Sequence, residues 1–193
     1  MLANECLKIL KVSILMVFLG GCMSPAGDNL AEKRSAVQEM RQTTLAKLYR
    51  IHPAAEAQIE KAVGYAVFSN IGVNLILLSA GNGWGVVRDN AKGHDTYMKM
   101  ATAGLGLGLG VKDFRGVFVF TERAAFDDFV NHGWDASAQA DAAAKSGDKG
   151  DALTGSIDVA PGIHLYQLTE HGLALQATIQ GTKYWKDSEL NAS

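Results

Sequence analysis

The stretch 101–111, which reads A-T-A-G-L-G-L-G-L-G-V, constrains the fold more than any other part of the sequence. Its glycines alternate with leucines, and this period of two places all of the glycines on one face of a β-strand: Gly104, Gly106, Gly108 and Gly110. Glycine weakens a strand and brings no side chain to pack. Four on one face therefore predict that either another element of the fold or a ligand lies close to them.

The spacing of these glycines excludes a phosphate-binding loop. A dinucleotide fingerprint needs G-x-G-x-x-G between a strand and a helix, and a Walker loop ends in G-K-[ST]. Here the spacing is G-x-G-x-G-x-G, followed by an expected turn at 112–116 and the apolar run 117–120. A strand, a turn and a second strand offer no helix N-terminus to hold an anion.

Residues 1–21 read as a lipoprotein signal peptide. Lys8 and Lys11 lead into the apolar run 12–19, which is shorter than the ~20 residues that span a bilayer. The sequence L-G-G-C that ends at Cys22 resembles the lipobox of bacterial lipoproteins, which implies lipid attachment at Cys22 by several acyl chains such as palmitate. An ordinary secretory signal or a membrane anchor is the alternative. Because Ser24 stands where an aspartate would favour the inner membrane, we expect an outer-membrane lipoprotein that faces the periplasm.

The remaining chain is expected to be a short polar tether, 22–29, and a single domain, 30–193. Removal of the signal would leave one cysteine, so no internal disulfide can form. The formal net charge of the whole chain is −2, which gives no case for a nucleic-acid partner.

A helix is expected over 30–50, with Asp28 or Asn29 as its N-cap. An apolar stripe runs along it, and its members are Val37, Met40, Leu48 and Ile51, with Leu45 at the edge. The only charges between 40 and 51 are positive, and these candidate membrane-facing residues are Arg41, Lys47 and Arg50. Such a helix either lies on an anionic membrane or packs its stripe against its own sheet.

The rest of the sequence alternates short apolar runs with turn residues. A second helix is expected at 54–63, strands at 65–68, 73–78, 84–88, 96–100, 101–111 and 117–120, and turns at 81–83 and 89–93. A helix at 122–130 with Thr121 as its cap, a strand at 134–145 in preference to an alanine-rich helix, and a hairpin of 162–168 with 173–184 complete the pattern. The predicted fold class is α+β, with the N-terminal helices and one internal helix packed on a curved, mainly antiparallel sheet or partly closed barrel.

Four segments in this order resemble the SYLF domain, a lipid-binding family with actin-binding members in fungi and lipoprotein members in bacteria. They are K-A-V-G-Y-A-V-F at 61–68, G-N-G-W-G-V-V-R at 81–88, the glycine strand with F-V-F at 118–120, and the closing G-L-A-L and G-T-K-Y at 172–175 and 181–184. Ser69 departs from the family pattern, in which proline often follows the phenylalanine. The resemblance spans about residues 45 to 190 and implies phospholipid binding, with an anionic phospholipid as a possible ligand.

The sequence offers no catalytic or metal-binding pattern. The five histidines show neither H-x-H nor H-E-x-x-H spacing, and no G-x-S-x-G nucleophile elbow is present. Asp127 and Asp128 are adjacent on the expected helix, so their side chains diverge, and we expect a solvated helix face in preference to an acid–base pair. We therefore expect a non-enzymatic protein without cofactor, metal or catalytic residue, which binds lipid. The alternative is an envelope scaffold that binds an unknown protein partner and no lipid beyond its own anchor.

Overall fold

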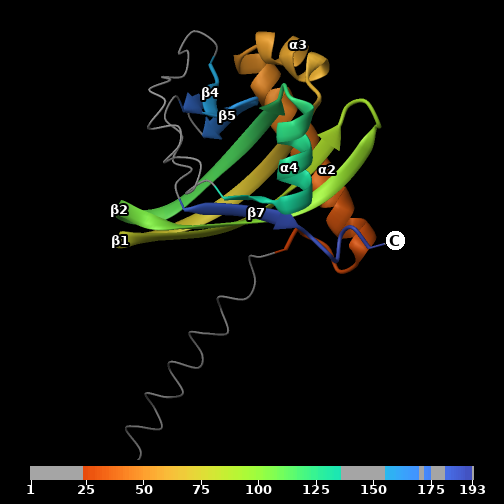
Figure 1. Ribbon diagram of the computed structural model, residues 1–193. Coiled ribbons are helices and arrows are strands. Elements are labelled where there is room, and N and C mark those ends of the chain that lie inside the picture. Colours follow the sequence, from red (N-terminus) through yellow and green to blue (C-terminus); the bar gives the residue numbers. More distant parts are fainter. Residues whose placement is uncertain (1–23, 136–154, 170–171, 175–180, 193) are drawn as a thin grey trace, which may run out of the picture.

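The computed structural model describes residues 24–135, 155–169, 172–174 and 181–192, and it gives only the strand pairing for 71–79 and 104–114. The described chain forms a curled, seven-stranded antiparallel sheet with helices on both of its faces (Figure 1). The predicted α+β class is confirmed.

Two long strands, β1 (Gly64–Asp89) and β2 (His94–Phe120), form the centre of the sheet. They pair in antiparallel register from Gly64 opposite Phe120 to Asp89 opposite His94, and the register shifts once, between Ile76 and Leu78. The glycine stretch lies inside β2, so its prediction as a strand is confirmed.

The pair of strands folds back on itself, so that the beginning and the end of β1 lie side by side. A Cβ atom built on Gly85 would lie 2.3 Å from the carbonyl oxygen of Val67, and one on Gly83 would lie 2.2 Å from that of Ser69. Only glycine permits backbones to approach this closely. The two glycines therefore allow the first and last segments of β1 to become neighbours.

Five shorter strands extend the sheet in the order β3-β7-β2-β5-β4, with β1 paired to β2 and β6 to β5. Their bounds are β3 Trp134–Asp135, β4 Ile157–Ala160, β5 Ile163–Thr169, β6 Gly172–Ala174 and β7 Thr182–Lys186. β2 pairs with β7 through Met98–Thr102 and with β5 through Arg115–Phe120. β2 therefore pairs with β7 near its beginning and with β5 near its end, and so connects the shorter strands into one sheet.

Helix α4 (Arg123–His132) covers one face of the sheet, which we call the α4 face. Aromatic rings dominate the core there: the edge of Phe68 meets Tyr184 at a centroid distance of 4.8 Å, and Phe120 meets Phe129 at 5.0 Å. Trp134 joins the same cluster. Tilted and edge-on ring pairs of this kind add to the stabilisation that burial of the rings provides.

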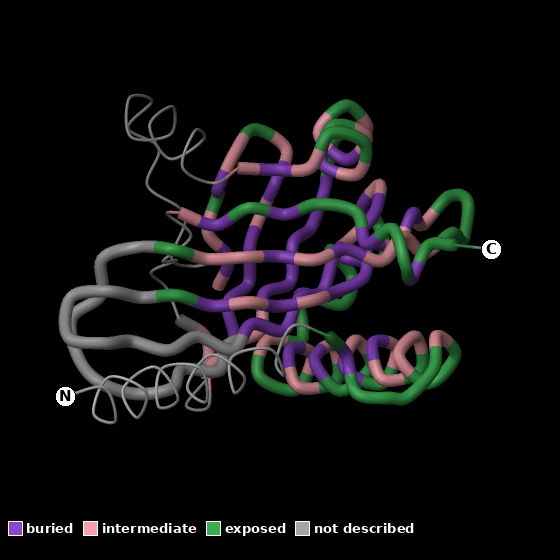
Figure 2. The backbone as a smooth tube through the Cα atoms, turned by 90° about the horizontal axis from the view of Figure 1, so that it is seen from below, coloured by how far each residue is buried: buried purple, intermediate pink, exposed green. Residues whose placement is uncertain are grey.

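Helices α2 (Leu30–Ile51) and α3 (Ala54–Lys61) cover the opposite face, which we call the α2 face. Val37, Met40 and Leu48 of the predicted stripe are buried there with Thr44, whereas Ile51 is 39% exposed, contrary to its prediction. Ile51 is the last residue of α2, where the chain turns towards α3. Figure 2 shows the buried residues gathered in the middle of the sheet and along one side of α2.

The predicted turns at 81–83 and 112–116 are wrong, because both segments continue the long strands. Gly83 admits the close approach of the Ser69 carbonyl oxygen and does not reverse the chain. Gly116 likewise lies within its strand. The predicted strand at 173–184 is also wrong as one element: Gly181 has a φ of 74°, and the residues after it pair with β2 instead of β5. The predicted strand at 134–145 lies outside the described residues except for β3.

We expect Gly85→Ala to lower the free energy of unfolding by ~1–3 kcal/mol, because the new methyl group would meet the Val67 carbonyl. Gly116→Ala is the matched control in the same sheet, since its Cβ would lie 3.4 Å from the Leu165 side chain, an ordinary contact. Urea unfolding measures both variants. Equal stability of the two variants would show that close approach within β1 is not required.

Candidate functional site

The predicted site residues fall into three groups in the structure. Cys22, the expected site of lipid attachment, lies outside the described residues. In β2, Gly104 pairs with Ser79, Gly108 with Ile76 and Gly110 with Asn74, and Gly106 lies between the paired positions. What covers the face of these glycines is not among the described contacts, so the choice between close packing and a ligand stays open.

The three basic residues of α2 do not form one exposed surface. Arg41 Nη1 lies 3.0 Å and 3.1 Å from the two carboxylate oxygens of Asp95, and its side chain is 16% exposed. Lys47 Nζ donates a 2.8 Å hydrogen bond to the carbonyl oxygen of Thr169 on β5 and is partly buried. Arg50 alone is exposed. The prediction that these residues face a membrane stays a prediction, but two of them already have partners within the fold.

We therefore expect Arg41→Gln to lower the free energy of unfolding by ~1–3 kcal/mol, because it removes one of the two arginines that pair with a partly buried carboxylate and leaves only Arg88. Arg50→Gln on the same helix is the control and should change it by less than ~0.5 kcal/mol. Thermal unfolding of the two variants tests the difference. If both variants had the same melting temperature, the Arg41–Asp95 pair would make no measurable contribution to stability.

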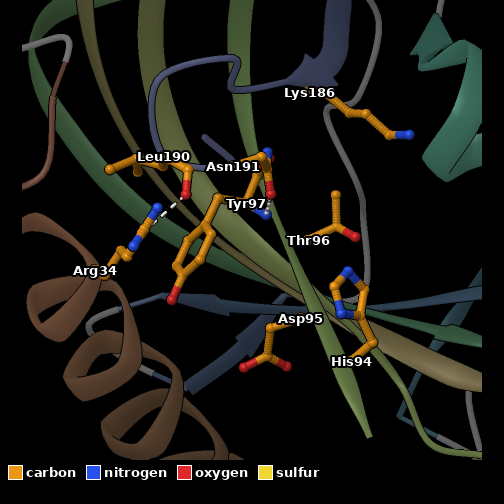
Figure 3. A pocket seen from close by; sticks show the side chains of 8 residues that line it. All are labelled: Arg34, His94, Asp95, Thr96, Tyr97, Lys186, Leu190 and Asn191. Atoms are coloured by element: carbon orange, nitrogen blue, oxygen red, sulfur yellow. Dashed lines mark hydrogen bonds between the residues drawn. The ribbon is translucent and has the colours of Figure 1, made fainter. Parts of the chain in front are cut away.

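A shallow cavity of about 400 Å³ opens between α2, the beginning of β2 and the residues that follow β7 (Figure 3). Its lining is mostly polar and consists of Arg34, His94, Asp95, Thr96, Tyr97, Lys186, Leu190 and Asn191. The lining comes from segments far apart in the sequence, so the cavity exists only because the C-terminal residues fold back across the sheet.

The C-terminal segment 187–192 is fastened to β2 and to α2 by backbone and side-chain hydrogen bonds. Asn191 accepts from the Tyr97 nitrogen at 2.9 Å and donates to the Tyr97 oxygen at 2.7 Å, and the Asp187 nitrogen donates to that oxygen at 3.0 Å. Arg34 Nε donates to the Leu190 carbonyl at 2.9 Å. The segment therefore holds the first turns of α2 against the sheet.

Asp95, at the edge of the cavity, is held by several side chains of the protein itself. Besides Arg41, its carboxylate accepts from Arg88 Nη1 at 3.1 Å and from Gln38 Nε2 at 3.1 Å. Gln38 also donates to the Tyr97 hydroxyl at 3.1 Å. The Asp95 carboxylate is therefore fully engaged, whereas Gln38 Oε1 is buried without a hydrogen-bond partner among the described contacts. The cavity offers a polar surface for binding. Within the described residues, no cluster of three or more potential ligands could hold a metal ion.

A buried carboxylate, Asp89, closes the turn between β1 and β2. It accepts from the backbone nitrogens of Ala91 and Lys92 at 3.1 Å, and Arg123 of α4 donates to both of its oxygens at 2.7 Å and 3.3 Å. The hydrogen bond from Arg123 is the main reason that the pKa of Asp89 lies below its ordinary value of 3.8. The pair therefore ties α4 to the central hairpin.

Because the folded-state pKa is lowered, the pair stabilises the protein fully above the unfolded-state pKa, and this contribution is lost as the pH falls through the folded-state value. We expect Asp89→Asn to lower the melting temperature at pH 7 and to flatten the loss of stability below about pH 4. Asp127→Asn is the control, because Asp127 pairs with the same arginine at 3.6 Å but is 50% exposed. If the melting temperature of Asp89→Asn fell with decreasing pH in the same way as that of the parent protein, this assignment would be contradicted.

Sequence reasoning missed Asp89, Asp95 and the segment 187–192. Their partners lie on other elements: Asp95 is 54 residues from Arg41, and Tyr97 is 94 residues from Asn191. No local periodicity signals such pairs.

A longer bacterial protein is similar to this chain. No protein-family model matches the chain. The chain is 39% identical over 159 residues to "Beta cell expansion factor A" of Aeromonas veronii. The aligned region covers 82% of this chain but 59% of that relative, so the chain spans little more than half the length of the protein it resembles. In the described part of the chain, every helix is too short or too polar to cross a membrane.

Proposed function

We propose that the protein is a non-enzymatic lipoprotein that is held at the periplasmic face of the outer membrane and binds the phospholipid surface with a SYLF-like domain. The observation that carries this proposal is how firmly the chain next to the expected anchor joins the fold. Asn29 caps α2 by accepting from the Glu32 nitrogen at 3.0 Å, and Glu32 accepts in return from the Asp28 nitrogen at 2.8 Å. Pro25 is buried.

The short distance along the chain limits how the domain can sit on a membrane. From Cys22 to Asn29 there are seven residues, which span at most about 25 Å when fully extended. An acylated Cys22 would keep the beginning of α2 within that distance of the bilayer. The same end of the molecule would therefore always be presented to lipid, at a high local concentration that compensates for weak affinity.

The segments that resemble the SYLF family pack against one another. The segment 61–68 ends α3 and begins β1, and the segment 81–88 ends β1. Gly85 of the second lies against Val67 and Phe68 of the first. This supports the resemblance, because the two segments are needed together for the strand to fold back. It also means that their glycines have a structural use and need no ligand.

The relative's name describes a factor in beta cell expansion and names no ligand. We therefore base the ligand on the residues of this chain and on the family resemblance. An envelope scaffold that binds a protein partner is the competing function.

We expect the mature protein to lack residues 1–21 and to carry acyl mass on Cys22, whereas Cys22→Ser should carry none. Cys6→Ser is the matched control, because Cys6 lies in the expected signal and its loss should leave acylation intact. Intact-protein mass spectrometry of the parent protein and of both variants measures the acyl mass. Acyl mass on Cys22→Ser, or none on the parent, would falsify the anchor.

The same Cys22→Ser preparation separates the two functions. Phospholipid that co-purifies with it and is detected by native mass spectrometry is the result we expect. A stoichiometric protein partner without lipid would favour the scaffold.

A further inference from the structure

Two tryptophans and a lysine form a row across three adjacent strands. Trp84 of β1 pairs with Lys99 of β2, and Lys99 pairs on its other side with Trp185 of β7. Side chains directly opposite each other in a sheet lie about 5 Å apart at their Cβ atoms. We call Trp84, Lys99 and Trp185 the tryptophan row.

The row lies on the α2 face, at the border of the region that α2 covers. The neighbours of Lys99 and Trp185 along their strands, Met98, Met100 and Tyr184, are buried in the aromatic core of the α4 face, so alternation directs the row to the opposite side. Trp84 packs partly against the core beneath α2. Trp185 is 39% exposed, and in the described part of the chain only Ile51 is a comparably exposed large apolar side chain.

Three carboxylates near the row are each paired with a lysine. Lys99 Nζ lies 3.2 Å from the buried carboxylate of Asp187. Lys183, next to the row on β7, lies 3.1 Å from Asp135, and Lys33 of α2 lies 3.0 Å from Glu189. These three pairs offset their own charges, whereas Arg34, next to Lys33, donates to the carbonyl oxygens of Leu190 and Ala192 instead of a carboxylate. Lys99 lies between the two tryptophans in the register of the sheet. The surface is therefore aromatic, and most of its charges are paired.

The row also lies near the beginning of the described chain. Trp185 precedes Glu189 by four residues, which span at most about 14 Å, and Glu189 holds Lys33 in the first turns of α2. The path from Cys22 to α2 is itself at most about 25 Å long. A bilayer that holds Cys22 is thus within reach of Trp185, whereas Ile51 lies at the other end of α2.

We propose that the tryptophan row is the surface through which the domain contacts the headgroup level of the phospholipid bilayer, with Trp185 inserted. This inference rests on the proposed anchoring at Cys22. Indole rings favour that level because they combine a large apolar body with one N–H donor, and lysine stems extend along apolar surfaces in the same way. Because most of the nearby charges are paired, the contact depends on the indoles, and it needs neither anionic lipid nor low salt.

The test uses the full acylated protein in phosphatidylcholine vesicles, with bromine atoms on the lipid chains close to the headgroups as a fluorescence quencher. The double variant Trp84→Phe/Trp134→Phe leaves Trp185 as the single reporter. Its matched control, Trp84→Phe/Trp185→Phe, leaves Trp134, which is 6% exposed within the core. We expect brominated lipid to remove most of the emission of Trp185 and little of that of Trp134, equally at low and high salt.

Each other outcome has a defined meaning. Vesicle-bound protein whose Trp185 is not quenched would overturn the proposal and leave the anchor intact. Quenching only in anionic vesicles at low salt would overturn the indole mechanism. Failure of the parent protein to associate with vesicles would instead contradict the proposed anchoring. An emission that shifts to the blue with protein concentration in the absence of lipid would identify a second copy of the chain as the occupant and overturn the proposal.

Discussion

The close approach of the two ends of β1 is the contact on which the rest of the structure depends. Gly83 and Gly85 let the backbone carbonyls of Ser69 and Val67 lie where a side chain would otherwise stand. The approach brings Phe68, near the beginning of β1, against Tyr184 of β7, which pairs with Met100 of β2. The aromatic core of the α4 face thus forms from residues that a straight hairpin would hold far apart.

The same folding-back decides which surfaces remain available for function. Helix α2 packs on its face with Val37, Met40 and Leu48, and the segment 187–192 fixes the beginning of that helix to β2. The basic residues Arg41 and Lys47 are used in holding α2 to the sheet. The tryptophan row is left beside α2, at the end of the molecule from which the expected tether leaves. Function at this end would therefore rely on aromatic contact more than on charge.

Sequence reasoning predicted the elements whose signals are local. The helix at 30–50 with its Asn29 cap, the strand through the glycines and the helix near 122–130 are confirmed, because their signals lie in neighbouring residues. The predicted Thr121 cap is wrong, because Glu122 stands at the N-cap and its side chain makes no capping hydrogen bond. The turn at 81–83 was wrong because glycine that admits a close neighbour looks in sequence like glycine that reverses a chain. The ion pairs of Asp89 and Asp95 and the tryptophan row could not be predicted, since they require the register between distant strands.

The central claim is that one end of the domain, marked by the tryptophan row, faces the membrane. The most direct measurement is the broadening of NMR signals of the acylated protein in nanodiscs that contain a small fraction of lipid with gadolinium on its headgroup. The account predicts the strongest broadening at the indole N–H groups of Trp84 and Trp185 and little at the amides around Arg50. Strongest broadening around Arg50, or equal broadening over the whole domain, would contradict it.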